Sequence, residues 1–241
     1  MPIRIQGRTI GVINLDSRKK NAFNAHHVDL LMVLAANAAL IYNRLAVIDN
    51  LKTKILYGNL LLESAEILNG EGSLRNKFAA IMDILQTRLD MRRGTIVLRR
   101  ETDLYTIHTA VGLKEDEIQK GVYKPGEGIT GRIIDNGEAY AVRNIYEEPA
   151  FLNRTSARRR DPKDPRPLSF IGVPIRIMDD TVGVLSVDKP FDGRTFDEDI
   201  SMLTILSSLL GQALQVEELT RSRSQRRSEE RRVGKECRSR W

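Results

Sequence analysis

The chain has 241 residues, and its 38 lysines and arginines against 32 aspartates and glutamates give a formal net charge of +6. With three histidines, one cysteine and no visible Ser/His/Asp set, paired catalytic carboxylates or metal cluster, the sequence offers no basis for an enzyme. No apolar run approaches the roughly 20 residues of a membrane span, and no signal peptide is visible, so we expect a soluble cytoplasmic protein without a cofactor.

Two stretches, residues 2–16 and 174–188, carry almost the same sequence, PIRIQGRTIGVINLD and PIRIMDDTVGVLSVD. At this offset of 172, the residues of the first copy with an identical partner are Pro2, Ile3, Arg4, Ile5, Thr9, Gly11, Val12 and Asp16. Each copy is followed by an aromatic residue, a short polar cap and an apolar helix, at 28–45 and 200–219. We infer a domain repeat, in which residues 1–45 hold only the last strands and last helix of a first domain.

The helix expected at 28–45 continues into a connecting segment, 46–63. Its apolar residues fall on alternating steps of four and three, with Lys52 and Asn59 interrupting the same seam, which is typical of a helix with one apolar seam. These residues are Ile41, Leu45, Ile48, Ile55 and Leu62. The spacing predicts a continuous helix from the first domain into the second. Two roles stay open for it, a parallel dimer through the seam or an amphipathic helix packed within the chain.

The second domain, 64–218, is expected to be complete. Ser73 follows a break at residues 69–72 and is expected to cap a helix. Periodicity and turn residues then predict helix 74–89, strands 94–100 and 104–110, a short helix at 114–120, helix 132–136, strand 139–142, hairpin 170–188 and helix 200–219. The order of these elements predicts an α+β domain built on one sheet.

The hairpin at 170–188 has two alternating apolar runs around the polar pair Asp179-Asp180, which predicts two strands joined by a tight reversal. Gly183 stands where the second strand must let another backbone come close. Further upstream, Gly126 and Gly128 permit positive φ in a turn before the helix at 132. A phosphate-binding loop is the alternative for these glycines, but the Gly-Lys-Ser/Thr ending of a P-loop is absent, and a structural turn is favoured.

Several motifs occur in an order that resembles the GAF domain family: GEGITGR, EEPAFLNRT, FIGVPI with VGVLSVD, and FDEDISMLTILSSLLGQA. More narrowly, LDMRRGTIVL, AVGL, FLNRTSARRR and SFIGVPI are similar to the N-terminal sensor domain of NifA-type activators of sigma-54 RNA polymerase. The resemblance covers about residues 60–217. It implies an α+β fold, with a central antiparallel sheet flanked by helices and long connecting helices at both ends. It also implies a small-molecule pocket that serves regulation and not chemistry.

The loop at 151–169 is the candidate ligand site, because arginine's planar fork suits carboxylates and phosphates. Its charged residues are Arg154, Arg158, Arg159, Arg160, Lys163 and Arg166, with Asp161 and Asp164. Our hypothesis is that Arg154 and Arg158 hold an anionic metabolite, which Asn153 and Thr155 orient, with Ser169 nearby. The resemblance suggests 2-oxoglutarate as that metabolite. The alternative is a solvated basic loop.

The expected function is therefore a sensing module for a small molecule or a regulatory protein, as a fragment of a sigma-54-dependent activator. The sensor region of a histidine kinase or a cyclic-nucleotide enzyme is the alternative, since one such domain serves many outputs. We expect no direct contact with nucleic acid, because the basic loop lacks interleaved aromatics. A homodimer through helices is expected. The seam of the last helix is Met202, Ile205, Leu209, Gln212, Val216 and Leu219.

The tail at 219–241 ends in fifteen residues, 227–241, that resemble the translation of a common sequencing adapter and are set aside as an artefact. This segment has six basic and three acidic residues, and it contains both the only cysteine, Cys237, and the only tryptophan, Trp241. Without it the net charge is +3 and no cysteine remains, which excludes disulfides, cysteine nucleophiles and thioether-linked chromophores. A genuine basic tail is the alternative.

Overall fold

The computed structural model describes residues 1–100, 103–158 and 164–238. The chain divides into two compact units, 1–59 and 60–241. Helix α1 (Ala25–Asn69) begins in the first unit and ends in the second, and it contains the whole of the expected connecting segment. The seam residues of this helix, Ile41, Leu45, Ile48, Ile55 and Leu62, are between 48% and 66% exposed.

The first unit contains a hairpin of β1 (Pro2–Ile5) and β2 (Arg8–Val12) that has the same register as the later repeat copy. The pairs of Pro2 with Val12 and Ile3 with Gly11 correspond to pairs between residues 174 and 184 and between 175 and 183. Both hairpins shift register after the second of these pairs. The turn residues Gln6 and Met178 both have positive φ, 47° and 55°. The repeat in sequence is therefore also a repeat in backbone geometry.

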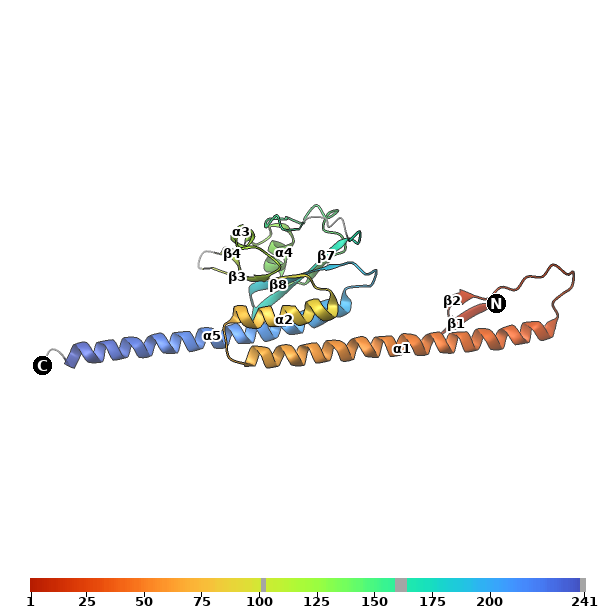
Figure 1. The fold of residues 1–241 in the computed structure, drawn as a ribbon, viewed down its shortest axis with the longest axis horizontal. Coiled ribbons are helices and arrows are strands. Elements are labelled where there is room, and N and C mark those ends of the chain that lie inside the picture. The colour runs from red at the N-terminus through yellow and green to blue at the C-terminus, as the bar shows by residue number, and fades with distance from the viewer. Residues whose placement is uncertain (101–102, 159–163, 239–241) are drawn as a thin grey trace. The chain divides into compact units, whose positions relative to one another are not determined.

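The second unit is built on a six-stranded sheet in the order β5-β4-β3-β8-β7-β6, in which all described neighbours pair antiparallel. The strands are β3 (Arg93–Arg99), β4 (Tyr105–Val111), β5 (Val122–Tyr123), β6 (Tyr140–Val142), β7 (Leu168–Ile177) and β8 (Asp180–Pro190). The repeat hairpin β7–β8 lies next to β3 inside this sheet, as Figure 1 shows. The expected α+β fold with a central antiparallel sheet is confirmed.

Helices cover both faces of the sheet (Figure 1). On one face lie α2 (Leu74–Leu89), against β3 and β4, and α5 (Asp197–Arg238), against β7 and β8. On the other lie α3 (Glu115–Gln119) and α4 (Gly128–Asn136). Ser73 caps α2 as expected, because its hydroxyl accepts a hydrogen bond from the Asn76 amide at 3.3 Å.

Two apolar layers result, one on each face. Under α2 and α5, the fully buried residues include Phe78, Ile81, Met82, Leu85, Leu203, Leu206 and Leu210. On the α4 face, the buried cluster includes Val97, Tyr105, Ile107, Ile129, Ile133, Phe170 and Val184. Burial of each large apolar side chain stabilises the fold by roughly 1.5–3 kcal/mol. The α4 face carries the candidate site, because the arginine-rich loop before β7 folds onto this layer.

Two glycines allow close contacts that a side chain would prevent. A Cβ on Gly183 of β8 would overlap the carbonyl oxygen of Val97 on the neighbouring strand, which confirms the expected close approach. Gly126 and Gly128 have φ of 76° and 65°, and the Gly126 amide donates to the Gly131 carbonyl at 2.8 Å. The backbone from Gly126 to Gly131 therefore forms a tight turn.

The structure differs from the expected elements at four places. The hairpin turns at Met178–Asp179, one residue earlier than expected, and Asp180 already belongs to β8. Helix α4 starts at Gly128 instead of residue 132, and the short strand β5 was not expected. Helix α5 continues to Arg238 instead of ending at 219. The residues beyond 219 are rich in glutamate, glutamine and arginine, which have high helix propensity.

In the described part of the chain, two helices are long and apolar enough to cross a membrane by length and composition alone, Ala25–Asn69 and Asp197–Glu217. No such stretch was expected from the sequence. A core helix of a soluble protein passes the same criterion, and the second helix packs one face against β7 and β8.

Candidate ligand-binding site

Two phenylalanines and an arginine form the centre of the candidate site. Phe151 precedes the arginine-rich loop and Phe170 lies on β7, and their rings meet edge to face with centroids 5.4 Å apart. The Arg158 guanidinium lies over both rings, 5.2 Å from the Phe151 centroid and 5.7 Å from that of Phe170. Such cation–π contacts are strongest where water is excluded. The sequence-predicted Arg158 is therefore placed inside the α4-face layer and not in solvent.

Arg158 forms a buried ion pair with Asp188 of β8. Its Nε donates to Oδ2 of Asp188 at 2.7 Å, and the two side chains are 5% and 0% exposed. Arg93 of β3 brings its Nη1 to 3.8 Å from the same oxygen. Burial alone would lower the pKa of Arg158, but the charge of Asp188 and its hydrogen bond outweigh burial and raise this pKa. The Arg158 guanidinium thus stays charged in the folded protein.

The loop backbone is held by its own polar side chains. The Asn153 amide donates to the Arg158 carbonyl at 3.1 Å and accepts from the Arg158 N–H at 3.4 Å. Thr155, fully buried, accepts from the Ala157 N–H at 3.4 Å and from Nη1 of Arg158 at 3.5 Å. Ser156 sits in the left-handed region with φ of 57°. Asn153 and Thr155 therefore position Arg158. Local side-chain-to-backbone bonds of this kind are common for Asn and Thr in tight loops.

Two atoms at this site are buried but make no hydrogen bond within the described part of the chain: Oδ1 of Asp188 and Nε of Arg154. The terminal nitrogen of Arg154 pairs with Glu127, at the start of α4. The phenol of Tyr123 on β5 lies close to these charges. Burial raises the pKa of Tyr123, Arg158 and Arg154 oppose this rise, and Asp188 adds to it. The Tyr123 hydroxyl therefore stays protonated at neutral pH.

The structure brings together Asn153, Thr155 and Arg158, and it places Arg154 at the edge of the same cluster. Ser169 is buried but precedes Phe170 on β7, so its side chain points to the opposite face of the sheet. There its hydroxyl donates to the Lys189 carbonyl at 2.6 Å.

Other basic residues of the loop are placed elsewhere. Arg166 forms an exposed network with Asp164 and Asp90, which Arg92 joins. Arg159, Arg160, Asp161 and Lys163 lie outside the described residues.

Sequence reasoning missed Asp188, Tyr123, Phe151 and Phe170 as members of the site. Strand β8 continues past Asp188 to Pro190 and buries it. A signal was available, because a carboxylate within an apolar strand requires a partner, and the arginine-rich loop offered several. Phe170 was seen only as part of the strand pattern.

The residue after Asp188 links the same strand to the opposite face. Lys189 brings its Nζ to 2.8 Å from Oδ2 of Asp199, and the two side chains are 9% and 6% exposed. Asp199 belongs to the first turn of α5. Consecutive side chains in a strand point to opposite faces, so Asp188 and Lys189 join the arginine loop on one side of the sheet to α5 on the other.

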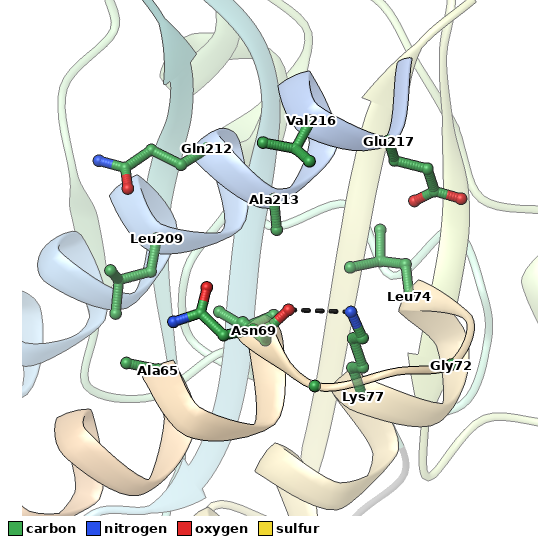
Figure 2. Close-up of a pocket in the computed structure, with 12 residues that line it drawn as sticks. Ala65, Asn69, Gly72, Leu74, Lys77, Leu209, Gln212, Ala213, Val216 and Glu217 are labelled. Atoms are coloured by element: carbon green, nitrogen blue, oxygen red, sulfur yellow. Dashed lines mark hydrogen bonds between the residues drawn. The ribbon is translucent and has the colours of Figure 1, made fainter. Parts of the chain in front are cut away.

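A separate groove of about 670 Å³ lies in the helical layer of the second unit, between the end of α1, the start of α2 and α5. Figure 2 shows Leu209, Ala213 and Val216 of α5 and Ala65 near the end of α1 among its lining residues. The Nζ of Lys77 donates to the Leu68 carbonyl at 2.8 Å in the same groove. Three residues of the expected α5 seam, Leu209, Gln212 and Val216, line this groove. It is distinct from the arginine cluster, which lies on the other face of the sheet.

Comparisons with known proteins agree with this architecture. The sequence profile of the GAF domain family matches residues 1–42 and 73–214. A Nif-specific regulatory protein of Herbaspirillum seropedicae is 32% identical over 174 residues, which cover 71% of this chain and 32% of that protein. The nitrogen fixation protein VnfA of Azotobacter vinelandii is 35% identical over 159 residues, 65% of this chain and 30% of VnfA. The chain spans about a third of the length of these relatives.

Solved structures show the same fold. The GAF domain of A. aeolicus nlh2, in an inactive state, has a TM-score of 0.59 and 24% identity, and the match covers 68% of this chain and 99% of that domain. A free methionine-R-sulfoxide reductase from Neisseria meningitidis, in complex with its substrate, has a TM-score of 0.56 and 16% identity, with 68% of this chain and 91% of that enzyme covered.

Proposed function

This chain belongs to the GAF domain family, and we propose that it is the sensing region of a longer, cytoplasmic sigma-54-dependent activator of the Nif-specific kind. The proposal rests on the similarity to Nif-specific regulators and on one structural observation, the buried Arg158–Asp188 pair. Beside this pair, Oδ1 of Asp188 and Nε of Arg154 make no hydrogen bond within the described residues. A buried charged cluster that stabilises little by itself is a candidate for a functional site. The role proposed is regulatory and not enzymatic, without direct contact with nucleic acid by these residues.

The proposed ligand is a small anionic metabolite held by Arg154 and Arg158. The Arg158 guanidinium lies over the two phenylalanine rings, where the low local dielectric strengthens an ionic contact, and the Arg154 guanidinium pairs with Glu127. Asn153 and Thr155 fix the loop that carries them. Ser169 does not contact the ligand in this proposal. From the opposite face of the sheet, its hydroxyl donates to the Lys189 carbonyl and so fixes β8 next to Asp188. A regulatory protein that binds the same loop is the second candidate partner.

Ligand binding would reach the output through β8 and α5. An anion near Arg154 and Arg158 competes with Asp188 for the guanidinium, and any movement of Asp188 also moves Lys189, the next residue. Lys189 holds Asp199 in the first turn of α5, and α5 runs outward to Arg238. A ligand that favours one position of this strand shifts the population of α5 arrangements by its differential affinity.

Calorimetry and thermal unfolding of the purified chain test the ligand site. A metabolite that binds should raise the melting temperature, because binding at about 100 times the Kd stabilises by about 2.7 kcal/mol. Arg158→Ala should abolish both the heat and the thermal shift. Arg166→Ala is the matched control, since this arginine lies in the same segment but is exposed. A metabolite panel that includes 2-oxoglutarate and gives no shift at all would remove the metabolite and leave the regulatory protein.

Hydrogen exchange tests the path to α5. The ligand should change the exchange of amides in the first turns of α5 in the wild-type chain. Lys189→Met should leave the ligand's Kd within about threefold, because Lys189 does not face the site, but it should uncouple α5 from the ligand. An unchanged response of α5 in Lys189→Met would show that this ion pair does not carry the effect.

The proposed dimer uses the helices. In the first unit, the exposed α1 seam at Ile41, Leu45, Ile48 and Ile55 offers a second copy apolar residues at helical spacing. In the second unit, the groove lined by the α5 seam offers a separate apolar surface. Sedimentation of the chain should show a dimer that Ile205→Glu disrupts, since Ile205 is 50% exposed on the α5 seam. A monomer at high concentration would contradict this part of the proposal.

A further inference from the structure

The two buried atoms without a partner among the described residues are of opposite kinds. Oδ1 of Asp188 can only accept a hydrogen bond from a donor while this carboxylate is charged, and Nε of Arg154 can only donate. Leaving either atom without a partner disfavours the empty fold, because a buried charged group retains its full desolvation cost. A molecule that satisfies both atoms needs an acceptor and a donor a short distance apart.

Both groups are linked to Arg158. Its Nε pairs with Asp188 at 2.7 Å, and its backbone is bonded at 3.1 and 3.4 Å to the side chain of Asn153, the neighbour of Arg154. The charges of Arg158, Arg154 and Asp188 also act on the pKa of Tyr123. Phe151 and Phe170 are the apolar neighbours of Arg158 on this face. The opposite atoms therefore belong to one small region with an aromatic wall, and not to two separate surfaces.

The charge of the cluster also limits the ligand. Among the described residues of this cluster, three arginines, Arg93, Arg154 and Arg158, contact two carboxylates, Glu127 and Asp188, and the carboxylate of Asp188 faces any ligand that reaches Oδ1. A dianion without a donor would place its charge against Oδ1 of Asp188, and like charges at close range in a dry site repel.

We propose that the ligand is a small acid that carries its own N–H or O–H donor beside a carboxylate, an α-amino acid in preference to the α-oxo acid of the same skeleton. Its carboxylate accepts from Nε of Arg154, and its amino group donates to Oδ1 of Asp188. An α-hydroxy acid has the donor without the positive charge and ranks between them. This inference rests on the proposed function, which it narrows from any anion to a donor-bearing acid.

Pairs of compounds that differ at one carbon test the inference. We would titrate the 241-residue chain with L-glutamate, 2-hydroxyglutarate and 2-oxoglutarate, and with further pairs of amino acid and matching oxo acid on small, apolar and aromatic skeletons. In the skeleton that binds best, the amino acid should bind about tenfold or more tighter than the oxo acid, the usual effect of one hydrogen bond to a buried charge. An oxo acid that binds as tightly or tighter overturns the inference and leaves the proposed sensing of an anion intact.

Two variants assign the preference to the two atoms. Asp188→Asn should bring the affinities of the amino acid and the matching oxo acid to within about threefold of each other, because the amide no longer offers a charged acceptor. Asp164→Asn is its control, since this carboxylate pairs with Arg92 and Arg166 outside the cluster. Arg154→Lys keeps the charge opposite Glu127 but has no Nε, and it should weaken binding of amino and oxo acid alike by about tenfold, whereas Arg166→Lys should not.

Circular dichroism confirms that each variant is folded before titration. If Asp188→Asn does not fold, two results still test the inference: the comparison of Arg154→Lys with Arg166→Lys, and the order of affinity of L-glutamate, 2-hydroxyglutarate and 2-oxoglutarate. A preference that survives in a folded Asp188→Asn variant overturns the assignment to Oδ1. Failure of every amino acid and every oxo acid to bind overturns both this inference and the metabolite form of the proposed function, whereas binding of oxo acids alone overturns only the inference.

Discussion

Removal of one partner of the Arg158–Asp188 pair should destabilise the fold far more than removal of both. In Arg158→Met the side chain keeps most of its length and its contact with the two phenylalanine rings. Among the described ion pairs, Asp188, fully buried, then retains the Arg93 contact at 3.8 Å alone. Breaking a buried pair in this way costs about 3–5 kcal/mol.

The double variant Arg158→Met with Asp188→Leu removes both charges and fills the site with apolar groups. Replacement of a buried ion pair by packed apolar residues is often neutral or stabilising. We therefore expect the double variant to lie within about 2 kcal/mol of the wild type, a coupling of about 2 kcal/mol or more between the two positions. Arg166→Met, which removes an exposed arginine, should cost no more than about 1 kcal/mol.

The free energy of unfolding can be measured by urea titration with far-ultraviolet circular dichroism as the signal. Fluorescence is unsuitable, since the only tryptophan is Trp241, at the end of the chain. For a domain of this size the single variant should also lower the melting temperature by roughly 6–20 °C. A cost below about 1 kcal/mol for Arg158→Met, or a double variant as unstable as the sum of the two singles, would refute a buried, mutually dependent pair.

Three further predictions concern single positions. Gly183→Ala should lower the free energy of unfolding by about 1–3 kcal/mol, because its Cβ would overlap the Val97 carbonyl. Gly58→Ala, which has open space in α1, should instead raise this free energy by about 0.5–1 kcal/mol. Urea midpoints compare the two variants, and equal effects would contradict the close approach at Gly183. The hydrogen bond from Arg166 holds the pKa of Asp164 far below its usual range. The stability that the Asp164 carboxylate contributes is therefore present above about pH 4 and is lost as the pH falls further. Between about pH 5 and about pH 2, Asp164→Asn should lose less stability than the wild type, and parallel curves of stability against pH would exclude this role. Lys189→Met should destabilise by about 1–3 kcal/mol, because the Asp199 carboxylate loses a buried cation, and an unchanged urea midpoint would show that the pair is energetically silent.

The sequence determined the features that depend on neighbours along the chain. The two hairpin copies share their register and the positive φ at Gln6 and Met178, because a hairpin register follows from its turn and its alternating residues. Helix 74–89 was predicted with its observed ends, since Ser73 and the break before it act locally. Apart from β5, the order of strands and helices in the second unit also followed from period and turn residues.

The tertiary structure alone decided the features that depend on partners far apart in the chain. Strand β5 is two residues long and exists because Tyr105 and Tyr123 pair across the sheet edge. The sequence placed Arg158 in a basic loop, which charge composition normally assigns to solvent. Its burial depends on Asp188, thirty residues later, and on two phenylalanines that the fold brings beneath it. A charged side chain is buried only where an opposite charge and an apolar surface meet, and that meeting is a property of the packed sheet and loop, not of either segment.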